Sequence, residues 1–131
     1  MRSVRIITAL LGLLTVAVGV WALLAPDSFG EFVNFPPHQH FLHDIGAFQL
    51  GIGVTLLLAT IWVDAISVAL AGYVTAGAAH TVVHIVDAHL GGSTAQTWSI
   101  GLLSLVAAAA LAIRWRVLAS PRPSTPAPAG R

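Results

Sequence analysis

The sequence predicts an all-α protein, a four-helix transmembrane bundle whose N and C termini both lie in the cytoplasm. Three observations support this prediction. Of the 131 residues, 56% are hydrophobic and 8% are charged, which is typical of an integral membrane protein, and the mean hydropathy is +0.85. The apolar residues fall into four runs of about the length that crosses a bilayer. The arginines all lie at the beginning of the first run or after the last one.

The first span is predicted over residues 4–24, directly after a start that carries Arg2 and Arg5. A positive start followed by an apolar run also resembles a secretory signal peptide. The run is long for a signal core, and Gly12 and Gly19 give it a small-residue face on which another helix can pack. We therefore expect an uncleaved anchor.

The second span is predicted over residues 44–62, where Gly46 and Gly53 repeat the same seven-residue spacing of small side chains. The connection before it, residues 26–42, is rich in proline and leaves the membrane core. Phe29, Phe32 and Val33 in this connection share one helical face, so a brief helix in the membrane interface is expected there.

The third span is predicted over residues 65–88 and the fourth over residues 95–113, with a glycine turn between them. These spans complete one transmembrane domain, residues 1–118. Residues 119–131 are rich in proline and alanine and are expected to form a disordered cytoplasmic tail.

Charge sets the expected orientation of the bundle. Four spans bring every arginine to one side of the membrane, and the positive-inside rule makes that side cytoplasmic. The expected location is the plasma membrane. Every histidine then lies toward the opposite, outer side. This separation is the strongest functional indication in the sequence.

The third span carries ionisable side chains that are costly in hydrocarbon, roughly 2.5 to 3.5 kcal/mol each on insertion scales. At helical spacing, two histidines and an aspartate of this span fall on one narrow stripe, and the start of the second span brings further candidates to the same depth. Imidazole and carboxylate ligands suit copper, zinc or iron. The predicted metal ligands are His40, His43, Asp44, His80, His84 and Asp87.

Three alternatives stay open beside a metal site. Haem b could be held between histidines of different helices, drawn from His40, His80 and His84. A metal-activated water with Asp44 or Asp87 as base would make a small membrane hydrolase. The histidines could also be packing contacts between helices in a purely structural subunit. Cysteine is absent from the sequence, which excludes thiol chemistry.

The glycines of the second and third spans have two explanations as well. They could leave room for a flat macrocycle, or they could allow close helix packing, which we favour. These residues are Gly46, Gly51, Gly53, Gly72 and Gly77.

The segment HFLHDIGAFQLGIGV, followed by AAHTVVHIVDAH, resembles an uncharacterised family of four-span membrane proteins found in actinobacteria, and more loosely the DoxX-like proteins. The family pattern of a histidine four residues before Asp-x-Gly, followed later by His-x3-His, falls here on His40, Asp44, Gly46, His80 and His84. DoxX-like proteins are associated with membrane redox processes. The resemblance therefore implies an accessory subunit of a larger membrane complex rather than an enzyme on its own. Its expected partners are lipid and other membrane subunits or a second copy, and no nucleic acid.

Overall fold

The computed structural model describes residues 1–120, except for the side chain of Val63. Regular structure in this part of the chain is entirely helical, as the sequence predicts. Residues 121–131, which hold most of the expected tail, lie outside the described residues. The elements in chain order are α1 (Arg2–Leu24), α2 (Pro26–Phe32), α3 (Gln39–Ile61), the short 3-10 turn η1 (Val63–Ala65), α4 (Ile66–Val86) and α5 (Thr94–Ala119).

Helices α1, α3, α4 and α5 are long and apolar enough to cross a membrane. They contain 21 to 26 residues, so at 1.5 Å per residue they measure about 32 to 39 Å, against about 30 Å for the hydrocarbon core of a bilayer. The chain therefore has the form of a multi-pass membrane protein.

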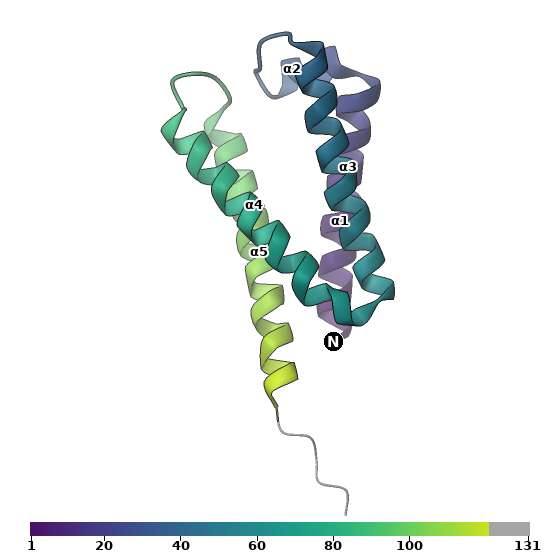
Figure 1. Ribbon diagram of the computed structural model, residues 1–131. Helices are drawn as coiled ribbons and strands as arrows, with labels where there is room; N and C mark the ends of the chain where they lie inside the picture. Colours follow the sequence, from purple (N-terminus) through teal and green to yellow (C-terminus); the bar gives the residue numbers. More distant parts are fainter. Residues whose placement is uncertain (121–131) are drawn as a thin grey trace, which may run out of the picture.

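The four long helices form two antiparallel hairpins that splay apart (Figure 1). Hairpin 1 consists of α1 and α3 with α2 between them, and hairpin 2 consists of α4 and α5. The start of α1, the η1 turn and the end of α5 lie at one end, which we call the arginine end. Helix α2 and the α4–α5 turn lie at the other, which we call the histidine end.

Hairpin 1 is held together by glycines that face each other at two levels. A Cβ atom added at Gly53 would lie 2.9 Å from the carbonyl oxygen of Gly12, and one added at Gly19 would lie 2.9 Å from the carbonyl oxygen of Gly46. The two backbones approach so closely that no larger residue fits without a shift. This glycine crossing confirms the small-residue faces predicted for both spans.

Hairpin 2 packs through side chains instead. Gly77 of α4 faces the hydroxyl of Ser104 on α5, and a Cβ atom at Gly101 would lie 3.4 Å from Cγ2 of Thr81, an ordinary contact. Close packing thus explains Gly77 too. A Cβ atom added at Gly51 or Gly72 would have no neighbour within 4 Å, so packing explains neither of them.

The buried side chains form two clusters, which differ in the number of helices that contribute to them. At the arginine end, the main cluster draws residues from all four long helices: Val4, Leu11, Leu56, Ala59, Ile66, Leu70, Ala107, Ala110 and Leu111. At the histidine end, the smaller cluster joins elements of hairpin 1 alone: Ala22, Phe29 and Leu42. The hairpins therefore share a core at the arginine end, whereas the histidine end of hairpin 2 contributes no residue to the smaller cluster.

Two helices extend five or more residues beyond the spans expected from hydropathy. Helix α3 begins at Gln39, five residues before the expected start, because His38 caps it: its Nδ1 atom accepts a hydrogen bond of 3.2 Å from the backbone N–H of Phe41. Helix α5 continues to Ala119, six residues past the expected end. Arg114 in this extension is 6% exposed, and its Nη1 atom lies 3.2 Å from Sδ of Met1.

Candidate functional site

The first pair of predicted ligands lies in the opening turns of α3. His40 and Asp44 are one turn apart, and Nε2 of His40 lies 3.7 Å from Oδ2 of Asp44. Their side chains are 83% and 53% exposed, so both are accessible from outside the protein. His43 is half-buried on another face of the same turns.

The residues just before α3 fix the position of this pair. The rings of Phe35 and Phe41 stack with centroids 5.1 Å apart, which folds the proline-containing connection back on the helix start. The ring of His38 meets the edge of Phe41 at 6.4 Å. His38 is therefore accounted for by its capping and ring contacts.

The second pair of predicted ligands lies in the last turns of α4. The imidazole rings of His80 and His84 have centroids 4.8 Å apart and are tilted by 59°. His80 is exposed, whereas His84 is half-buried against the α4–α5 turn, where a Cβ atom at Gly92 would lie 3.3 Å from its Nδ1 atom. Asp87 ends the helix as its C-cap residue. Two nitrogen ligands thus face the same space from one helix.

The structure does not bring the two pairs together. Within residues 1–120, no three side chains of histidine, aspartate or glutamate form a group that could hold a metal ion. The six predicted ligands therefore resolve into one pair on each hairpin, to which His43 and Asp87 add no third ligand. The separation follows from the splay of the hairpins toward the histidine end (Figure 1).

Hydrogen bonds between loops join the two hairpins at the histidine end. Asn34 and Gly92 bond twice at 3.4 Å, once through the Gly92 N–H to the Asn34 carbonyl and once through the Asn34 side-chain amide to the Gly92 carbonyl. Gln96 donates a further bond of 3.1 Å from Nε2 to the carbonyl of Phe32. We call these contacts the loop bridge.

Sequence reasoning missed the loop bridge, although a signal for part of it was present. Ser93 and Gln96 form a capping box at the start of α5, in which each side chain bonds the backbone of the other. The Ser-x-x-Gln spacing predicts that box. The same glutamine then reaches hairpin 1, which spacing within one helix does not reveal.

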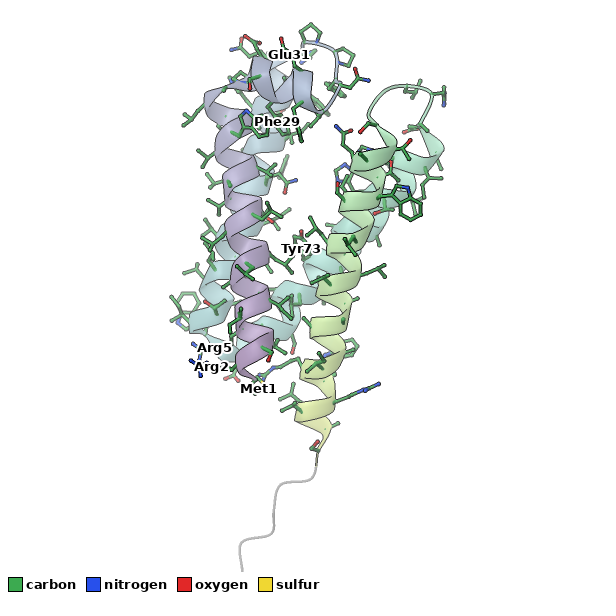
Figure 2. All side chains as sticks on the ribbon, turned by 180° about the vertical axis from the view of Figure 1, so that it is seen from behind. Met1, Arg2, Arg5, Phe29, Glu31 and Tyr73 are labelled. Atoms are coloured by element: carbon green, nitrogen blue, oxygen red, sulfur yellow. The ribbon has the colours of Figure 1, made fainter. Side chains whose placement is uncertain are left out.

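Within α4, Tyr73 lies between the two hairpins (Figure 2), and its side chain interacts with that of Thr15 on α1. Tyr73 and the open glycines Gly51 and Gly72 also line an apolar groove of about 560 Å³ between α3 and α4. Phe48 and Trp62 complete its aromatic walls. None of the described residues that line this groove is a histidine, so it offers space without axial ligands for a haem.

Comparison of the chain with protein-family models, with curated proteins and with solved structures gave no match.

Proposed function

We propose that this chain is an accessory subunit of a larger complex in the plasma membrane, and that it holds a transition-metal ion at its outer face through His80 and His84. The observation that carries the proposal is the pair of imidazoles, with ring centroids 4.8 Å apart, on one face of a membrane-spanning helix. Neutral imidazole is a common ligand of zinc, copper and iron, and two of them one turn apart can bind a single ion.

The exposure of His80 supports a partner for this pair. An imidazole on the surface of a spanning helix would face lipid, where polar groups are costly and are retained mainly for function. Binding an ion satisfies a ring nitrogen of each histidine. A neighbouring subunit could then supply further ligands, because the pair is open on the side that His80 faces.

Two ligands make an incomplete site, which favours an accessory role. Protein zinc sites use three or four protein ligands. Further ligands could come from His40 and Asp44 of hairpin 1 or from a partner subunit, and the exposure of His40 is compatible with either source.

A metal ion fits this pair better than haem does. Axial ligands of a haem approach the iron from opposite faces of the porphyrin, so they come from facing helices. His80 and His84 lie on the same helix with their rings in contact distance, which leaves no space for a porphyrin between them.

The proposal is tested by metal binding to the full chain in detergent. Wild type is compared with His80→Ala, His84→Ala and, as a matched control, His89→Ala, which removes an exposed histidine of the turn after α4. We expect about one Zn²⁺ or Cu²⁺ per wild-type chain by elemental analysis and a loss of affinity of at least about tenfold in the first two variants. His89→Ala should bind as wild type does. Equal binding by all four proteins would disprove the site.

A structural role is the second candidate, and the contact of His84 with Gly92 favours it. In that case His84→Ala would lower the thermal stability of the protein without changing its metal content.

Two further variants, His40→Ala and Asp44→Asn, test whether hairpin 1 contributes ligands. Their metal affinity should fall only if the two pairs share an ion.

A further inference from the structure

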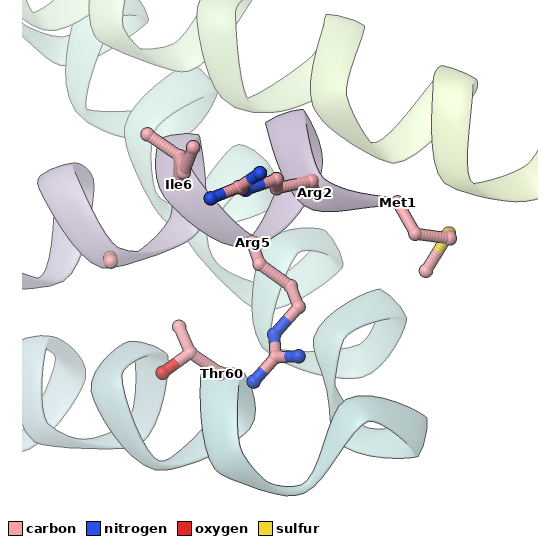
Figure 3. Close-up of a pocket in the computed structure, with 6 residues that line it drawn as sticks. Met1, Arg2, Arg5, Ile6 and Thr60 are labelled. Atoms are coloured by element: carbon pink, nitrogen blue, oxygen red, sulfur yellow. The ribbon is translucent and has the colours of Figure 1, made fainter.

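A second candidate site lies at the arginine end, on the opposite end of the molecule from the histidine pairs. A pocket of about 520 Å³ opens between the first turns of α1 and the last turn of α3. Arg2 and Arg5 line it together with Thr60 and an apolar floor that includes Ile6 and Ala9 (Figure 3). The pocket therefore combines positive charge with an apolar surface.

Neither arginine of the pocket has an ionic partner within residues 1–120. In that part of the chain, the carboxylate at this end is Asp64, and it forms an ion pair with neither Arg2 nor Arg5. The hydroxyl of Thr60 donates to the carbonyl of Leu57 at 2.7 Å, so its oxygen remains an acceptor. The guanidinium groups are consequently the main donors to anything that enters the pocket.

The spacing of the arginines is compatible with an anion bound between them. Residues three apart on a helix are neighbours on its surface, and like charges in that relation repel each other. An anion placed between Arg2 and Arg5 would remove the repulsion and accept charge-assisted hydrogen bonds from both, in the geometry that makes arginine a common ligand of phosphate. The start of α1 adds the positive end of a helix dipole.

The position of the pocket relative to the membrane indicates which class of anion it would meet. Arg2 and Arg5 stand in the first turns of a 23-residue apolar helix, at the level where the headgroups of a bilayer begin. We propose that the pocket binds the phosphate of an anionic phospholipid, with Arg2 and Arg5 as donors and the lipid's apolar part along Ile6 and Ala9. This site is independent of the proposed metal site.

The test uses the full chain, purified in an uncharged detergent and freed of lipid. Binding of phosphatidylglycerol and of zwitterionic phosphatidylcholine is measured by native mass spectrometry for wild type, Arg2→Gln/Arg5→Gln and Arg116→Gln. We expect wild type to bind phosphatidylglycerol about tenfold more tightly than phosphatidylcholine. The double variant should lose this preference. Arg116→Gln removes one exposed arginine at the same end and should keep it.

A second double variant, Arg2→Lys/Arg5→Lys, keeps the positive charge that orients the first span and loses the planar donor pair. It should insert normally and show a reduced preference for phosphatidylglycerol. Competition by inorganic phosphate separates the two sources of the same chemistry: phosphate that displaces the lipid at millimolar concentration assigns the pocket to soluble phosphate. Equal binding of both lipids by wild type, or equal loss in Arg116→Gln, would overturn the proposal.

Discussion

Hairpin 1 and hairpin 2 are built from similar apolar, glycine-bearing helices, yet they are held together in different ways. In hairpin 1, glycines bring backbone against backbone at two levels. In hairpin 2, a glycine meets the side chain of Ser104, which can rotate. Backbone contacts at two levels leave less freedom than side-chain contacts, so we expect hairpin 1 to be the more rigid of the two. Hairpin 2, which carries His80 and His84, can adjust to what binds it.

The largest effect is expected where a methyl group is forced into the glycine crossing. Gly53→Ala would place a carbon 2.7 Å from the backbone nitrogen of Val16, so α1 and α3 must separate. We expect a loss of about 3 kcal/mol in the free energy of unfolding, measured by denaturant titration in micelles.

Gly51→Ala is the matched control on the same helix, because nothing lies within 4 Å of its added carbon. Alanine favours helix over glycine, so this variant should match or exceed wild type in stability. Equal losses in the two variants would show that the crossing is not the source of the rigidity of hairpin 1.

A smaller loss is expected from the corresponding change in hairpin 2. Gly77→Ala meets the Ser104 hydroxyl, which can turn away from its bond to the carbonyl of Ile100. We expect a loss of about 1.5 kcal/mol in the same titration. Ser104→Ala should restore part of it, since the double variant removes the obstructing hydroxyl. A loss as large as that of Gly53→Ala would mean that the hairpins are equally rigid.

The smallest change in stability is expected at the loop bridge. Gln96→Ala removes the exposed hydrogen bond to Phe32 and the bond that Oε1 of Gln96 accepts from the Ser93 N–H, at an expected cost of about 1 kcal/mol. Its effect on geometry should be easier to detect. Because the chain has no cysteine, two introduced cysteines can be labelled selectively. One replaces Gln39 at the start of α3, and the other replaces Ala88 just after α4.

Electron-resonance distances between these labels should be longer or more widely distributed in Gln96→Ala than in wild type, because hairpin 2 is then held to hairpin 1 at this end by the Asn34–Gly92 bonds without the Gln96 bond. Thr94→Ala, an exposed change at the start of the same helix, is the control. An unchanged distribution in Gln96→Ala would exclude the bond between Gln96 and Phe32 as a contact that sets the spacing of the hairpins.

Much of the fold could be predicted from the sequence, because a membrane-spanning helix is recognised from one continuous run of apolar residues, without knowledge of distant contacts. The four long helices and the small-residue faces of α1 and α3 are confirmed in the structure. The early start of α3 was not predicted, because histidine is an unusual cap and His38 follows two prolines that suggest a loop.

The candidate site was only partly accessible to sequence reasoning. The spacing of His80 and His84 predicts neighbouring rings, and the structure has them. The prediction that His40 and Asp44 join this pair in one site depends on their lying at the same depth in the membrane. Equal depth does not determine the lateral distance between α3 and α4. That distance depends on contacts between segments remote in sequence, such as those of Asn34 with Gly92.

The two levels of the glycine crossing are seven residues apart, about 10 Å along each helix. Two helices in contact at a single level can change their crossing angle, whereas contacts at two levels oppose both a change of angle and a shift along the helix axis. These two contacts restrict both the crossing angle and the register of α3 on α1, and His40 and Asp44 lie at the start of α3. If the spacing between the His40/Asp44 pair and the His80/His84 pair changes, we expect hairpin 2 to move about the core that the hairpins share at the arginine end.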